Sequence, residues 1–134
     1  MEINKQNIVA IDVGLKRIGL AKSALGIVLP LKPIIRHNRN QAACEVRECI
    51  LKEGARILVC GVPKDNEEMC RRIYHFVKLL ELDEDIKVVY VDESFSSHEA
   101  LSKMAGSKKE RKKDGSLDSL AASVILERFL MSQK

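Results

Sequence analysis

The chain has 134 residues, of which 46% are hydrophobic and 31% charged; this composition suits one hydrophobic core and excludes an intrinsically disordered protein. No apolar run approaches the ~20 residues that a transmembrane helix needs, and the first residues lack the basic-then-apolar order of a signal peptide. We therefore expect a single domain over residues 1–134, located in the cytoplasm.

The net charge of +4 comes from one short segment. Between Lys103 and Lys113 six basic residues accompany one acid, and the remaining 17 basic and 18 acidic residues nearly cancel. A concentrated basic segment is typical of a surface that binds a polyanion, although a solvated loop without a partner has the same composition.

Three strands open the chain. Residues 7–13 form a nearly continuous β-branched run, typical of a strand buried on both faces. Residues 17–23 and 27–35 follow after short turns, and Pro30 and Pro33 favour a position at a sheet edge for the third strand. Strands joined by tight turns predict an antiparallel meander.

The apolar spacing then alternates between helix and strand. The expected helices cover residues 41–53, 66–82, 96–104 and 116–131, and the expected buried strands cover residues 55–60 and 86–91. A meander followed by alternating helices and strands predicts an α/β fold, with a mixed five-stranded sheet and helices on both faces.

The four cysteines form no C-x-x-C pair: they are Cys44, Cys49, Cys60 and Cys70. A zinc site needs ligands clustered at short spacings. We therefore expect reduced and mostly buried thiols.

Two acids stand in or directly after apolar strands. Asp12 lies inside the first strand, where an unpaired carboxylate costs on the order of several kcal/mol. Glu93 follows the last predicted strand, at the carboxyl end where open α/β sheets bind ligands. Either acid could instead belong to an ordinary turn or loop at the end of its strand.

Asp118 falls in the first turn of the last predicted helix. The residues 3, 4, 7, 8 and 11 positions beyond it are all apolar: Ala121, Ala122, Ile125, Leu126 and Phe129. Asp118 therefore heads the stripe that should face the sheet. The helix dipole also favours an acid in a first turn, by ~0.3–1 kcal/mol, but this does not explain its place on the buried face.

Carboxylates that converge from separate elements repel one another unless a cation lies between them. Oxygen ligands suit a hard divalent ion, so Asp12, Glu93 and Asp118 predict a site for Mg²⁺ or Mn²⁺. One or two such ions can activate water and stabilise the leaving oxygen in phosphodiester hydrolysis.

Four motifs carry a family resemblance. Residues 12–19 are similar to D-x-G-x-K-x-I-G, residues 61–63 to G-[LVI]-P, residues 92–97 to D-E-R-x-S-T and residues 117–122 to D-S-x-A-A. Together, in this order and over nearly the whole chain, they resemble the YqgF family of pre-16S rRNA nucleases, also called Holliday junction resolvase-like proteins. The resemblance implies a single ribonuclease H-like nuclease domain in which Asp12, Glu93 and Asp118 are the catalytic metal ligands.

The chain departs from the family pattern at two positions. Ser94 replaces the usual arginine and Ser97 replaces threonine. A missing guanidinium removes a bidentate phosphate contact beside Glu93 and leaves the metal ligands intact.

Basic residues near the acids are the expected substrate contacts. They are Lys16, Arg17, Lys108, Lys109, Arg111, Lys112 and Lys113. Lysines without interleaved aromatic residues favour contact with phosphates over base reading, so we expect recognition by shape and charge.

The leading functional hypothesis is processing of the pre-16S rRNA 5′ end in ribosome biogenesis by a monomer or weak homodimer. A branched-DNA resolvase, which generally needs two symmetric active sites, remains open. So does a nucleic-acid-binding factor without catalysis. A sugar-kinase or actin-like ATPase is disfavoured, because 134 residues leave no room for a second domain and no Walker A pattern is present.

Overall fold

The computed structural model describes residues 6–133 apart from segment 93–115, and residues 116–118 by their backbone alone. Three predicted features therefore lie outside the described residues: Glu93, the expected helix 96–104 and the basic segment 103–113, called the lysine-rich segment below. The elements are β1 (Ile8–Val13), β2 (Arg17–Ala24), β3 (Ile27–Ile35), α1 (Arg39–Lys52), β4 (Ile57–Val62), α2 (Glu67–Leu79), β5 (Lys87–Asp92) and α4 (Ser116–Ser132).

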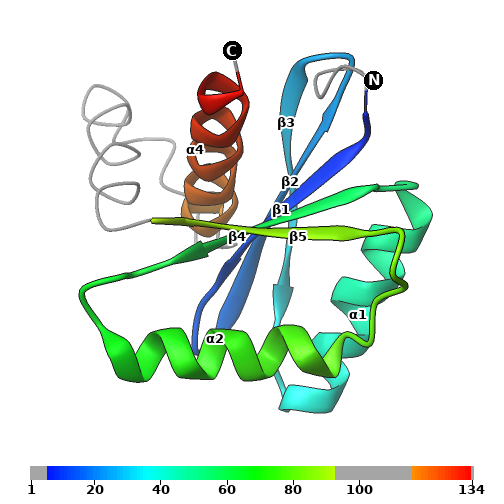
Figure 1. Ribbon diagram of the computed structural model, residues 1–134. Coiled ribbons are helices and arrows are strands. Elements are labelled where there is room, and N and C mark those ends of the chain that lie inside the picture. Colours follow the sequence, from blue (N-terminus) through cyan, green and yellow to red (C-terminus); the bar gives the residue numbers. More distant parts are fainter. Residues whose placement is uncertain (1–5, 93–115, 134) are drawn as a thin grey trace.

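The five described strands form one mixed sheet in the order β3-β2-β1-β4-β5 (Figure 1). β1, β2 and β3 pair antiparallel, whereas β4 pairs parallel with both β1 and β5. The predicted meander and mixed sheet are confirmed. β3 lies at an edge, as its two prolines indicate, because proline has no amide to donate to a second neighbour.

β5 differs from the prediction. The run Val88-Val89-Tyr90-Val91 indicated a buried strand, but β5 lies at the other edge of the described sheet and its side chains are half-buried or exposed. An apolar run shows that a strand packs against something, but cannot show whether it lies at the centre or the edge of a sheet.

Helices cover both faces of the sheet (Figure 1). Val9, Ile11 and Val13 of β1 pack in a core with α1 and α2. Ile8 and Ala10, which point to the opposite face, pack with α4. Since consecutive strand residues point to opposite faces, β1 separates the two cores, which explains its nearly continuous apolar run.

The helix ends depend on local capping. Asn38 accepts a hydrogen bond from the Gln41 amide at 2.7 Å and forms a capping box, so α1 begins at Arg39 rather than at the expected Gln41. Gly54, with φ of 63°, follows the end of α1 as expected. α2 ends at Leu79, three residues before the expected end, and Glu81 adopts a left-handed φ of 46°.

The cysteine prediction is right only in part. All four thiols are free, and Cys60 and Cys70 are buried, but Cys49 is half-buried and Cys44 is exposed. Cys44 lies on the solvent side of α1, where its helical spacing places it away from the core positions Val46 and Ile50. No helix in the described part of the chain is long and apolar enough to span a membrane.

A buried serine fixes the start of α4 on the sheet. The pairing of β2 with β3 shifts register between Ile18 and Leu20, which indicates a β-bulge. Beside it, the Ser119 hydroxyl donates a hydrogen bond to the Leu31 carbonyl at 2.6 Å and accepts one from the Leu20 amide at 3.4 Å. The serine thus partners backbone groups on two strands, and the first turns of α4 are held over β2 and β3.

We expect Ser119→Ala to lower the free energy of unfolding by ~1–3 kcal/mol, because buried polar groups on β2 and β3 lose their partner. Ser123→Ala is the matched control. Its hydroxyl is also buried in α4, but among the described residues it donates its hydrogen bond within the helix, to the Ser119 carbonyl. Urea unfolding followed by circular dichroism measures both, and equal losses would contradict the anchoring role of Ser119.

Candidate active site at the carboxyl end of the sheet

The carboxyl ends of three strands share one edge of the molecule. β1, β4 and β5 run parallel, with Ile11 beside Cys60 and Val62 beside Asp92. In open α/β sheets ligands bind at such an edge, where loops and helix starts converge. This geometry places one of the predicted acids, Asp12, which is next to last in β1, and it places Asp92, the residue that precedes Glu93 in the chain.

Asp12 is half-buried and faces α4. Ile8 and Ala10 point to that side of β1, and the alternation of the strand carries Asp12 to the same side. Its register partner on β2 is Gly19. A glycine has no side chain, so Gly19 places no group of its own beside the Asp12 carboxylate at this cross-strand position.

A fixed turn follows Asp12. The Gly14 amide donates to the Arg17 carbonyl at 2.9 Å, and a Cβ on Gly14 would lie 2.6 Å from that oxygen. Only glycine fits without displacing the turn. The Lys16 carbonyl accepts a hydrogen bond from the Arg36 amide at 2.9 Å. Both predicted substrate contacts in this turn follow Asp12 closely in the chain, four and five positions after it, and Lys16 is exposed while Arg17 is half-buried.

The backbone of Asp118 lies in the first turn of α4, as expected. The five apolar positions after it on the stripe are all buried, namely Ala121, Ala122, Ile125, Leu126 and Phe129. The register connects this turn to Asp12. The Ser119 hydroxyl accepts a hydrogen bond from the Leu20 amide on β2. Leu20 pairs with Ile11 on β1, and the neighbouring Gly19 pairs with Asp12. The start of α4 and Asp12 therefore lie at the same level of the sheet.

The other predicted residues lie outside the described part of the structure. These are Glu93, the side chain of Asp118, and Lys108, Lys109, Arg111, Lys112 and Lys113. Among the described side chains, no group of three or more His, Cys, Asp or Glu residues is placed to hold a metal ion. The convergence of the three acids therefore stays a prediction.

Arg128 is a cation near the site that the sequence analysis missed. It lies on α4, and its Nη1 donates to the Asp92 carbonyl at the end of β5, at 3.3 Å. This contact joins residues 36 positions apart, so no local pattern points to it. It brings a guanidinium to the strand end that directly precedes Glu93.

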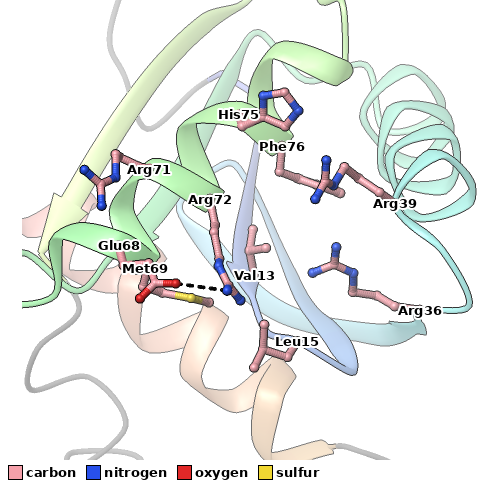
Figure 2. Close-up of a pocket in the computed structure, with 10 residues that line it drawn as sticks. All are labelled: Val13, Leu15, Arg36, Arg39, Glu68, Met69, Arg71, Arg72, His75 and Phe76. Atoms are coloured by element: carbon pink, nitrogen blue, oxygen red, sulfur yellow. Dashed lines mark hydrogen bonds and ion pairs between the residues drawn. The ribbon is translucent and has the colours of Figure 1, made fainter.

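A second feature at this end of β1 is a pocket of about 480 Å³ on the side of α1 and α2. Its described lining includes four arginines, Arg36, Arg39, Arg71 and Arg72, and one acid, Glu68. Figure 2 shows the side chains of Arg36 and Arg39 reaching toward α2, with Val13 and Leu15 between them and Arg72. No charge run marks this cluster in the sequence, because its arginines come from separate segments of the chain.

Arg36 ties the pocket to the turn after Asp12. Its Nη1 donates to the Gly14 carbonyl at 2.7 Å, and its guanidinium lies 5.4 Å from the centre of the Phe76 ring, a cation–π contact. Burial, and then the positive charge of Arg39, lower the pKa of the Arg36 guanidinium below its usual value. The two arginines are thus close enough to repel each other.

Relatives of the chain are nucleases by name. A protein of Helicobacter hepaticus is 44% identical, and the match covers 95% of this chain and 96% of the relative. A protein of Sulfurovum is 54% identical, and the match covers 90% of this chain and 95% of the relative. One from Campylobacter jejuni subsp. doylei is 46% identical over 92% and 95%. All three are named "Putative pre-16S rRNA nuclease".

Solved structures share the fold at low sequence identity. The resolvase RuvC of Thermus thermophilus, in complex with a Holliday junction substrate, is 12% identical with a TM-score of 0.59 and covers 95% of this chain and 96% of its own. The Holliday junction resolvase of fowlpox virus is 13% identical with a TM-score of 0.60, and the match covers 94% of this chain and 99% of the resolvase. At these identities the likeness shows the fold, which is ribonuclease H-like as expected.

The family model RuvX, described as Holliday junction resolvase, matches residues 6–132, nearly the whole chain. This match and the relatives' identities confirm the resemblance carried by the four motifs. The chain therefore belongs to the RuvX family, also called YqgF.

Proposed function

We propose that the chain is a divalent-metal-dependent nuclease that hydrolyses phosphodiester bonds in structured RNA and processes the 5′ end of pre-16S rRNA. One observation carries the proposal. A half-buried carboxylate, Asp12, faces α4 at the carboxyl end of the sheet, level with the helix turn that contains Asp118. The names of the relatives favour RNA as the substrate.

The donor set fits a hard divalent cation. Asp12, Glu93 and Asp118 offer carboxylate oxygens, which suit Mg²⁺ or Mn²⁺ better than a softer ion. Bound there, one or two such ions would supply an activated water and charge stabilisation for the leaving oxygen.

The protein's own residues would supply rigidity and substrate positioning. β1 is paired on both sides and holds Asp12 in a strand that cannot slide without exposing two cores. The fixed Gly14 turn presents Lys16 and Arg17 beside it for phosphate contact. Arg128, held at the Asp92 carbonyl, would offer a guanidinium at a strand end that lies two positions before Ser94 in the chain, and Ser94 replaces the family's arginine.

A branched-DNA resolvase is the second candidate, favoured by the family's description and by the RuvC-like fold. Resolution of a symmetric junction needs two paired active sites. A stable dimer would therefore support this function, and a monomer or weak homodimer would support RNA processing. The cytoplasmic location and the single domain over residues 1–134 stay predictions.

We expect Asp12→Asn, Glu93→Gln and Asp118→Asn each to lower the rate of metal-dependent cleavage by at least about 100-fold, since even changes beside metal ligands cost ~10–100-fold. The assay compares pre-rRNA ends with four-way DNA junctions, with Mg²⁺, with Mn²⁺ and with EDTA. Asp83→Asn is the matched control, because Asp83 is an exposed acid outside the site. Cleavage by all three variants at the wild-type rate would leave a binding factor without catalysis as the better function.

Neutralising the lysine-rich segment should weaken binding without abolishing the chemistry. We expect the change of Lys108, Lys109, Lys112 and Lys113 to glutamine to lower RNA affinity and to flatten its dependence on salt, since each lost phosphate contact removes ~0.7 from the slope of log K against log[salt] on single strands. Fluorescence anisotropy in EDTA measures this. An unchanged slope would show that the segment does not contact the substrate.

A further inference from the structure

We propose that the pocket formed by Arg36, Arg39 and Arg72 over Val13 and Phe76, here called the arginine pocket, binds a backbone phosphate of the nucleic-acid substrate away from the bond that is cut. The proposal rests on the proposed function for the source of that phosphate. The pocket lies on the face of β1 opposite to Asp12, and its described lining residues are separate from the lysine-rich segment.

The position of the pocket links it to the cleavage site. Val13 lines the pocket, while Asp12, the preceding residue, faces α4. Their Cα atoms are about 3.8 Å apart, as for any consecutive residues. A strand that crosses the carboxyl end of β1 would therefore meet the carboxylate side first and the arginine pocket directly after it.

The arginines are arranged for a shared anion. Arg36 uses Nη1 for the Gly14 carbonyl and stacks on Phe76, which holds its guanidinium in place while other N–H groups remain for a ligand. Arg39 lies near enough to add to the repulsion on Arg36. A phosphate between the two would turn this repulsion into attraction on both sides, with the bidentate geometry that guanidinium groups favour.

The lining charge is unbalanced. Among the ten described lining residues Glu68 is the one acid, and it pairs with Arg72 at 3.0 Å. Three further arginines line the same space. The volume of about 480 Å³ is within the ~300–1,000 Å³ range of ligand pockets, and the apolar Val13 and Phe76 would strengthen a polar contact by limiting water around it.

The test compares two double variants of equal charge. Arg39→Gln/Arg72→Gln removes two pocket cations and spares Arg36, which anchors the turn after Asp12. Arg47→Gln/Arg56→Gln removes two exposed cations outside the pocket. RNA binding is titrated in EDTA from 50 to 200 mM salt. We expect the pocket variant to bind ~10-fold more weakly with a slope shallower by ~0.7–1.4, corresponding to one or two lost phosphate contacts.

We expect the control variant to bind within ~2-fold of wild type. Arg39→Lys/Arg72→Lys should recover the salt slope but only part of the affinity, because lysine keeps the charge and loses the bidentate contact. Urea midpoints confirm that all three variants fold. Equal affinity and slope for the pocket and control variants would overturn the proposal.

Inorganic phosphate and a mononucleotide form the second arm of the experiment. If either stabilises the wild type but not the pocket variant, while RNA binding is the same for both, the pocket serves a free phosphate compound and the proposal is wrong. Because binding is read in EDTA, the cleavage assay remains independent. Loss of cleavage in Asp12→Asn supports the proposed nuclease function, independently of the result for the pocket. A binding defect in the pocket variant supports phosphate binding by the arginine pocket, even if no cleavage is found.

Discussion

The Ser119 hydroxyl, hydrogen-bonded to backbone groups of both β2 and β3, is the contact on which the proposed site depends. Those strands carry a register shift at this point, and a serine on the helix supplies the partner that the ladder lacks there. The contact fixes where the first turns of α4 lie on the sheet. Since Leu20 pairs with Ile11 and Gly19 with Asp12, it also decides that the helix turn of Asp118 lies level with Asp12.

The carboxyl end of β1 separates two kinds of charge. Asp12 faces α4, whereas Val13 faces the arginine pocket on the side of α1 and α2. The Gly14 turn joins the two sides, because its carbonyl holds Arg36 and its amide closes the turn onto Arg17. Under the proposed function, a nucleic acid bound across this end would meet Asp12, the proposed metal ligand, and the arginine pocket close together, which is how positioning and chemistry can be coupled in a small domain.

The sequence predicted most of the fold because its signals are local. Prolines marked β3 as an edge strand, Gly54 marked the end of α1, and the apolar stripe after Asp118 marked the buried face of α4. The errors concern properties that depend on neighbours. β5 was expected to be buried and is a half-exposed edge strand, and the thiols were expected to be mostly buried, whereas Cys44 is exposed and Cys49 half-buried.

For the site, the sequence by itself determined the residue types, the four motifs and hence the family, since each motif is a short run whose chemistry is visible in the chain. The tertiary structure alone decided which groups lie together. Ser119 meets Leu31 across 88 positions, Arg128 meets Asp92 across 36, and Arg36 reaches Gly14 across 22. Such contacts arise from sheet order and helix packing, which bring distant segments together without leaving a periodic pattern in either one.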